Sequence, residues 1–188
     1  MNSSNKTHLA LLRGINVSGH KMIKMDALKK ALENIGFQLV QTYIQSGNVF
    51  VDTDEENSVK VGFLIKQEIS KTFGFDVPVI VIGQRDLEAC LERNPYLKLP
   101  DVDLKKLYVS FLSAELPDTI INQVNLNFIK PDELSLDGSR LYLKYDISPA
   151  KTRLDNNWIE KKMNVTATTR NWNTTMRLLE IFAERKLQ

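Results

Sequence analysis

The fold class is decided by one stretch near the start of the chain, His8-Leu9-Ala10-Leu11-Leu12-Arg13-Gly14-Ile15-Asn16. Its apolar residues fall on both faces of an extended chain, a pattern typical of a strand that is covered from both sides. Apolar residues at helical spacing follow over 25–35, and Gly36 stands where a helix would end. A buried strand followed by a helix indicates a protein of mixed α and β structure.

The rest of the first half extends this start to the order β-α-β-β-α-β. The pattern predicts a hairpin of 40–44 and 48–51 around Ser46-Gly47, and then a helix from Ser58, as its N-cap, to Phe73. A short apolar run at 77–82 predicts a buried strand, and 85–93 predicts one further helix. This is the split βαβ order of ferredoxin-like domains.

A similar order begins again in the second half. The pattern predicts a strand at 107–112, a helix at 118–126, a hairpin over 133–145, a helix from Ser148-Pro149 to Met163 and a final helix at 173–186. The final helix stands where a fourth strand would be expected. We therefore predict an α+β fold of two ferredoxin-like (split βαβ) halves packed together, the second ending in an extra C-terminal helix. The first half spans 1–96, a linker spans 97–105, and the second half spans 106–188.

Length and composition set the broad class. A chain of 188 residues with 43% hydrophobic content can bury a sizeable core. Residues 1–7 are polar and lack the apolar run of a signal peptide, and no stretch approaches the roughly 20 apolar residues of a membrane span. The single cysteine, Cys90, and the two histidines provide no disulfide and no zinc-binding spacing. We expect a cytoplasmic protein without membrane, metal or cofactor.

Charge is unevenly spread along the chain. Lys and Arg outnumber Asp and Glu by 6 to 2 in residues 1–36 and by 10 to 5 in residues 140–188, whereas residues 37–139 carry 9 and 16. The two basic ends could form one anion-attracting face if the fold brings them together. The alternative is that these lysines and arginines only keep the surface soluble.

Three polar segments interrupt the apolar pattern: the first at 13–21, the second at 42–48 and the third at 168–174. Glycine, amide, hydroxyl and guanidinium groups at the ends of strands are frequent components of binding sites. The candidate ligand-binding residues are Arg13, Asn16, His20, Lys21, Gln45, Asn48, Arg170 and Asn171.

Each polar segment also has a structural interpretation. Arg13 would lie in a buried strand and would need either an internal partner or an anionic ligand. Gln45 and Asn48 could serve the chemistry of a tight turn. Asn171 or Asn173 could cap the final helix.

Several catalytic motifs are excluded. The first segment has neither the GxGxxG nor the GxxxxGK[ST] spacing, and Ser46 lacks the G-x-S-x-G setting of a serine hydrolase. His20 could titrate near neutral pH, but the sequence offers no partner for a general base. No catalytic residue is identified, and whether the protein is an enzyme stays open.

The three polar segments carry a resemblance to a known family. The motifs 11–17, 42–49 and 166–174 resemble, in the same order, those of the bacterial family known as domain of unknown function 1697. The resemblance spans nearly the whole chain. It implies an α+β fold of two ferredoxin-like parts, and it brings no established activity, substrate or catalytic residue.

The best-supported function from the sequence is binding of a small anionic ligand, phosphate- or nucleotide-like, between the two halves. Arg13 and Arg170 would then converge on one site. The alternatives are a nucleic-acid-binding module and a protein-interaction scaffold without a ligand. Against the nucleic-acid alternative, the strands are apolar on both sides and the aromatic RNP pattern is absent from the sequence.

Overall fold

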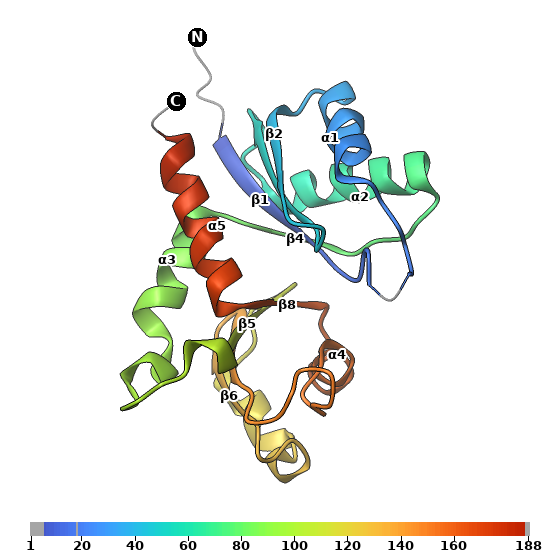
Figure 1. The fold of residues 1–188 in the computed structure, drawn as a ribbon. Coiled ribbons are helices and arrows are strands. Elements are labelled where there is room, and N and C mark those ends of the chain that lie inside the picture. Colours follow the sequence, from blue (N-terminus) through green and yellow to red (C-terminus); the bar gives the residue numbers. More distant parts are fainter. Residues whose placement is uncertain (1–5, 18, 187–188) are drawn as a thin grey trace. The chain divides into compact units, whose positions relative to one another are not determined.

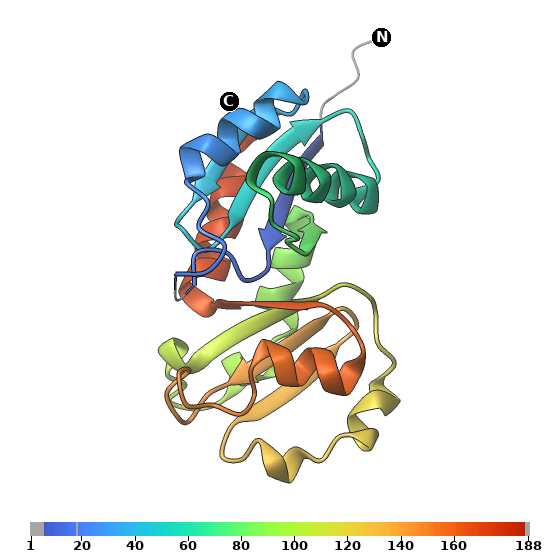
Figure 2. The same ribbon diagram turned by 90° about the vertical axis from the view of Figure 1, so that its right-hand side faces the viewer.

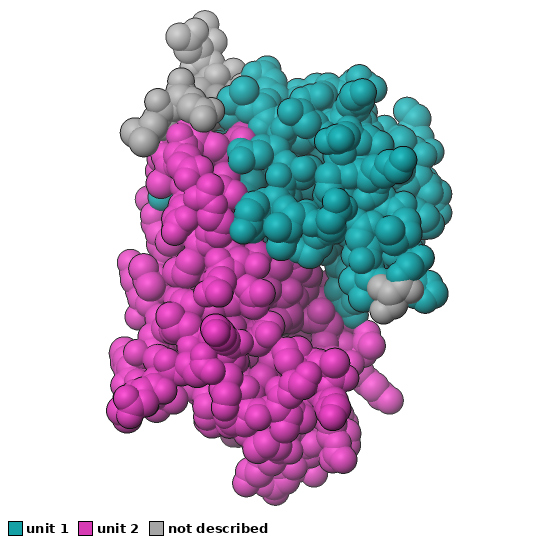
Figure 3. Space-filling view, in the orientation of Figure 1, with its two compact units in different colours: residues 1–84 teal, residues 85–188 magenta. Residues whose placement is uncertain are grey.

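The computed structural model describes residues 6–17 and 19–186, and it confirms the α+β class (Figure 1). Two four-stranded antiparallel sheets each carry helices, and a helix ends the chain. The chain forms two compact units, residues 1–84 and 85–188, which are described separately (Figure 3). The limits expected from the sequence, 1–96 and 106–188 with a linker between them, stay a prediction.

The first unit has the β-α-β-β-α-β order expected from its sequence. Its elements are β1 (Lys6–Leu12), α1 (Met25–Asn34), β2 (Gln38–Tyr43), β3 (Asn48–Thr53), α2 (Ser58–Phe73) and β4 (Val79–Ile82). The strands lie in the order β2-β3-β1-β4, so the first strand of the chain is central and pairs with both β3 and β4.

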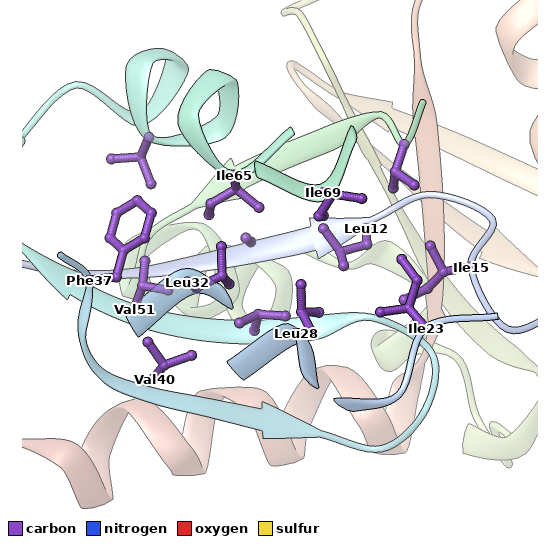
Figure 4. Packing of buried hydrophobic residues seen from close by; sticks show 14 residues of the cluster. Leu12, Ile15, Ile23, Leu28, Leu32, Phe37, Val40, Val51, Ile65 and Ile69 are labelled. Carbon is purple, nitrogen blue, oxygen red and sulfur yellow. The ribbon is translucent and has the colours of Figure 1, made fainter. Parts of the chain in front are cut away.

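Both helices of the first unit cover the same face of its sheet (Figure 2). The apolar stripes of α1 and α2 pack against alternate residues of β1 and β3, because every second side chain of a strand points to one face. Figure 4 shows this core, whose buried residues include Leu12, Leu28, Leu32, Val51, Ile65 and Ile69.

Two details of the first unit differ from the sequence prediction. The strand β1 ends at Leu12, so Arg13 lies in the following loop and is partly exposed, not within a buried strand. The chain turns there because Gly14 adopts a left-handed conformation with φ of 71°. The N-cap of α2 is Asn57 rather than Ser58, since the Asn57 side chain accepts hydrogen bonds from the amides of Val59 and Lys60.

The second unit contains a sheet with the equivalent strand order, β6-β7-β5-β8. Its strands are β5 (Leu107–Leu112), β6 (Glu133–Asp137), β7 (Arg140–Lys144) and β8 (Ala167–Asn171). Its α-helices are α3 (Gln84–Arg93), α4 (Asn156–Met163) and α5 (Trp172–Arg185). Four short 3-10 helices lie at Pro95–Lys98, Leu104–Lys106, Asp118–Gln123 and Leu126–Phe128.

The fourth strand, β8, corrects the sequence prediction for the second unit. The third polar segment begins in β8, a strand that pairs with β5 at the edge of the described sheet, and it continues into the start of α5. The second unit therefore has a complete four-stranded sheet, and α5 follows the fourth strand instead of replacing it.

Two expected helices of the second unit also differ. In place of one helix over 118–126, the segment 118–128 forms two short 3-10 helices, in keeping with its several asparagines, which compete with the backbone for hydrogen bonds. The helix expected from Ser148-Pro149 begins only at Asn156, where the Asp155 side chain accepts a hydrogen bond from the amide of Trp158 at 2.8 Å.

Helices α3 and α4 cover opposite faces of the second sheet (Figure 1). On one face, a single core contains Leu141 and Leu143 of β7, Tyr145 directly after that strand, and Ile159 and Met163 of α4. The alternate residues Arg140 and Tyr142 hydrogen-bond to α3 on the other face. Alternate side chains of β7 thus point to opposite faces of the sheet.

His8, in β1, gives the protein an expected pH dependence. Its Nε2 lies 2.9 Å from the carbonyl oxygen of Glu55, while its buried Nδ1 has no hydrogen-bond partner among residues 6–17 and 19–186. Burial lowers the pKa of His8, against the opposing effect of the bond to Glu55, with Lys6 adding to the lowering and Asp52 opposing it. The unfolded chain therefore binds a proton at a higher pH than the folded chain does, and stability falls as the pH falls.

We expect the free energy of unfolding to be level above about pH 6.5 and to decline below it, with a slope of at most about 1.4 kcal/mol per pH unit for this one proton. Denaturant titrations between pH 8 and pH 5 measure this slope. His8→Gln should flatten the curve in this range, whereas His20→Gln, at an exposed position, should leave it unchanged. Equal curves for the wild type and His8→Gln would contradict the assignment.

Candidate functional site

The first and second polar segments meet in the first unit through the side chain of Asn16. Its Nδ2 donates to the carbonyl oxygens of Ile23 at 3.0 Å and Gln45 at 2.9 Å, and its Oδ1 accepts from the amide of Ile23 at 2.8 Å. Both amide protons are thus used within the protein. Asn16 closes the loop between β1 and α1 and ties that loop to the turn between β2 and β3.

The second polar segment has mainly turn chemistry. The Nδ2 of buried Asn48 donates to the carbonyl oxygen of Tyr43 at 3.0 Å and to the Ser46 Oγ at 3.1 Å. The Gly47 carbonyl accepts from the amide of Leu12 at 2.8 Å, so the turn lies close against the end of β1. The side chain of Gln45 is exposed.

The remaining candidates of the first segment lie around the same loop. The Lys21 Nζ donates to the carbonyl oxygen of Asp76. His20 is exposed, and Arg13 is partly exposed, with its amide donating to the Pro78 carbonyl at 2.9 Å. Residue 18 lies outside the described residues. The structure thus brings the candidate residues of the first and second segments together. The side chains of Asn16 and Asn48 form hydrogen bonds that stabilise the loops in which they lie.

Arg170 and Asn171 lie in the second unit, where β8 passes into α5. The Asn171 Oδ1 accepts from the amide of Thr174 at 2.7 Å, so Asn171 caps α5. The Nη1 of buried Arg170 donates to the Thr168 Oγ1 at 2.8 Å and to the Thr169 carbonyl at 2.9 Å. Burial lowers the pKa of Arg170 to about 10, so it is still a cation at neutral pH.

Arg13 and Arg170 belong to different units. Their expected convergence on one ligand, with Asn16 and Lys21, therefore stays a prediction.

Asn171 lines a hollow of about 130 Å³ on the second unit. Its other lining residues are Leu104, Lys105, Tyr108, Trp172 and Asn173. The hollow thus combines the first residues of α5 with the segment that leads into β5. It places one lysine and two asparagines beside two aromatic side chains.

A second hollow, of about 250 Å³, adjoins the first. Its lining residues are Lys105, Lys106, Tyr108, Tyr145, Asp146, Ile147, Ser148 and Pro149. Lys105 and Tyr108 line both hollows. We call the two together the two-hollow surface.

The aromatic wall of the second hollow is fixed in place. The rings of Tyr108 and Tyr145 pack with their centres 4.6 Å apart and their planes tilted by 39°. The Tyr145 hydroxyl donates to the carbonyl oxygen of Leu154 at 2.8 Å. Burial raises the pKa of both tyrosines, so both are neutral at physiological pH.

The loop on the far side of the second hollow is held by buried Asp132. Its carboxylate accepts from the amides of Asp146 at 2.7 Å and Ile147 at 3.3 Å, and from the hydroxyl of Thr152. The loop is therefore anchored at several points, and the hollow is preformed.

The lysines of the two-hollow surface differ in their partners. Lys106 forms an ion pair with Asp146 at 3.1 Å, and Asp146 also lies 3.2 Å from Lys144. The Lys105 side chain is exposed and has no ion-pair partner within residues 6–17 and 19–186. Lys105 is thus a cation available to a ligand at the point where the hollows join.

Sequence reasoning identified only Asn171 among the residues of the two-hollow surface. Lys105 lies in the expected linker, and Tyr145 continues the apolar alternation of Leu141 and Leu143, so both resemble ordinary surface and core residues. The sequence feature that could have indicated this surface is the pair Lys105-Lys106, which directly precedes a strand that contains Tyr108.

A second polar cluster joins β7 to α3. Arg140, which is buried, contacts the Asp137 Oδ2 through Nε at 3.2 Å and Nη2 at 3.1 Å, and the Asp86 Oδ1 through Nη1 at 3.3 Å. The Tyr142 hydroxyl donates to the same Asp137 oxygen at 2.9 Å. Burial raises the pKa of Cys90, nearby on α3, to about 12, which makes it a packing residue and not a thiolate nucleophile at neutral pH.

The described part of the chain has neither a metal-binding cluster nor a membrane-spanning helix. There, no group of three or more His, Cys, Asp or Glu side chains is arranged to hold a metal ion. No helix among the same residues has the length and apolar character needed to cross a membrane.

Comparisons with known proteins give a family and a fold. The family model described as "Protein of unknown function (DUF1697)" matches residues 6–142, which include the first two polar segments but not the third. No curated protein matches the chain. A solved structure, described as that of the conserved bacterial protein SP0830 from Streptococcus pneumoniae, is similar with a TM-score of 0.69 and 24% identity, over 94% of this chain and 98% of that one. This likeness shows the fold alone.

Proposed function

Because the chain belongs to the family described as "Protein of unknown function (DUF1697)", whose description names no activity, we propose its function from the geometry. The protein binds a small anionic ligand at the two-hollow surface of its second unit. The observation that carries this proposal is Lys105, a cation without an ion-pair partner among the described residues, at the point where the two hollows join.

Polar groups beside Lys105 support an anion in the smaller hollow. Asn171 and Asn173 supply amide groups, and the first N–H groups of α5 have no partner within the helix, although that of Thr174 donates to the Asn171 Oδ1. The proposal is narrower than the sequence expectation, since it needs only the second unit. Participation of Arg13, Asn16 and Lys21 from the first unit stays a separate prediction.

The proposal extends to a setting in the bacterial cytoplasm. The single cysteine is buried as a free thiol, which suits a reducing compartment, and the structural neighbour is a bacterial protein.

Thermal stability in the presence of inorganic phosphate and pyrophosphate tests the function. A ligand at 100 times its dissociation constant adds about 2.7 kcal/mol to the free energy of unfolding. We expect at least one of these anions to stabilise the wild type, and Lys105→Ala to weaken the binding about tenfold, as for loss of one charge-assisted contact.

Lys161→Ala is the matched control, since it removes the same charge from another exposed position of the second unit. Equal loss of binding in both variants would show that the net charge of the protein causes the effect, and it would contradict a site at Lys105. No stabilisation by phosphate, pyrophosphate or a phosphate ester would contradict the function itself.

A further inference from the structure

We infer that the ligand of the two-hollow surface is a mononucleotide, with its base against Tyr108 and Tyr145 and its phosphate at Lys105. This inference rests on the proposed function and names the class of the ligand.

The size of the hollows is the first argument. Their volumes are about 250 and 130 Å³, and each is smaller than the roughly 300 Å³ at which small-molecule pockets begin. Because Lys105 and Tyr108 line both, a single ligand can pass from one hollow into the other. A ligand with two parts fits this surface better than a simple anion does.

The chemistry of the two hollows differs in the way a nucleotide requires. The lining of the larger hollow is mainly apolar and aromatic, beside Lys105, Lys106 and Asp146, with Tyr145 held by Leu154 and Tyr108 packed on Tyr145. The smaller hollow contains Asn171 and Asn173. A planar base suits the first and an anionic phosphate suits the second.

The larger hollow also has polar groups for recognition of a base. Ser148 and Asp146 belong to its lining, with the Asp146 carboxylate paired to Lys106 and Lys144, and the buried Asp132 carboxylate holds the loop that carries both. Hydroxyl and carboxylate oxygens accept hydrogen bonds from the exocyclic amine of a base. A preformed loop lowers the entropy cost of binding.

The test compares a mononucleotide with two ligands that each contain one of its parts, either the phosphate or the base. Dissociation constants for adenosine 5′-monophosphate, ribose 5-phosphate and adenosine are measured by calorimetry with the full chain. We expect the monophosphate to bind at least about tenfold more tightly than ribose 5-phosphate, because base stacking on an aromatic side chain commonly contributes that much.

Variants of the protein test whether Tyr108 contacts the base and Lys105 the phosphate. Tyr108→Leu should weaken binding of the nucleotide by a larger factor than binding of ribose 5-phosphate and so remove most of the advantage of the nucleotide, whereas Tyr108→Phe should keep that advantage. Lys105→Ala should weaken the two phosphates equally and leave adenosine unaffected. Tyr43→Leu, in the first unit, serves as the control for loss of a tyrosine and should alter none of these constants.

The possible failures are distinguishable. Equal binding of adenosine 5′-monophosphate and ribose 5-phosphate would overturn the inference and leave the proposed function intact. Absence of binding by every phosphate would overturn both. Binding of a short RNA with steep salt dependence, without binding of mononucleotides, would overturn the inference in favour of a nucleic-acid-binding surface. If Tyr108→Leu does not fold, Tyr108→Phe and the ligand series still decide the matter.

Discussion

Replacement of Gly47 by alanine is expected to lower the free energy of unfolding by about 3 kcal/mol, because a left-handed backbone and an overpacked side chain both add to the cost. Gly47 has φ of 79°, and a Cβ added there would lie 2.7 Å from the Leu12 Cβ and 3.0 Å from the Ile15 Cδ1. Leu12 and Ile15 are buried in the core of the first unit and have little room to move. Denaturant unfolding of the purified variant measures the loss.

Gly74→Ala is the matched control for this prediction. Gly74 has a similar φ of 72°, but an added Cβ there meets nothing within 4 Å. We expect Gly74→Ala to cost only the conformational part, about 1 kcal/mol. Equal losses for the two variants would show that close packing against Leu12 adds nothing.

Replacement of Arg140 by methionine is expected to cost about 3 kcal/mol, since loss of one partner leaves a desolvated charge behind. Asp137 accepts two hydrogen bonds from Arg140 and one from Tyr142, and its side chain is 24% exposed. Methionine keeps much of the apolar stem and removes the guanidinium. The same unfolding measurement reports the effect, and Arg177→Met, which removes a partly exposed arginine paired with Glu180 and Glu184, should destabilise the protein much less than Arg140→Met does.

The pH dependence of the Arg140 variant provides a second readout. Burial opposes ionisation of Asp137, but the hydrogen bonds from Tyr142 and Arg140 outweigh it and hold the pKa of Asp137 below its usual value of 3.8. The folded chain therefore takes up this proton at a lower pH than the unfolded chain does. The stabilisation is complete well above pH 3.8 and is lost as the pH falls through the folded pKa. In Arg140→Met, the free energy of unfolding should fall less steeply at acidic pH. An unchanged dependence on acidic pH would contradict the pairing of Arg140 with Asp137.

Most of the fold could be predicted from the sequence because its elements have strong periodic signals. Glycine favours helix ends and tight turns. Gly36 and Gly74 therefore predict where α1 and α2 end, and Gly47 predicts the hairpin around it. The strand β8 was missed because its residues, such as Thr168 and Arg170, are polar and resemble the cap of the next helix. A short edge strand is defined by its partner, here β5, and not by its own composition.

The candidate site was predicted less well, for a physical reason. Asn16 and Asn48 were singled out as polar residues near turns, and the structure shows that their amides bond to loop carbonyls. Lys105 and Tyr145 lie 40 residues apart and meet in one hollow only through the pairing of β5 with β7. Sequence spacing gives no measure of such proximity.

The position of the first strand within each sheet has a consequence for the order of folding during synthesis. The strand β1 needs both β3 and β4, so the first sheet can close once Ile82 is available. The strand β5 needs β8, so the second sheet has to wait for Asn171. A nascent chain that stops after β7 and before β8, between Lys144 and Ala167, has a complete first sheet and an open edge on β5, and that edge is where a stalled chain is exposed to aggregation.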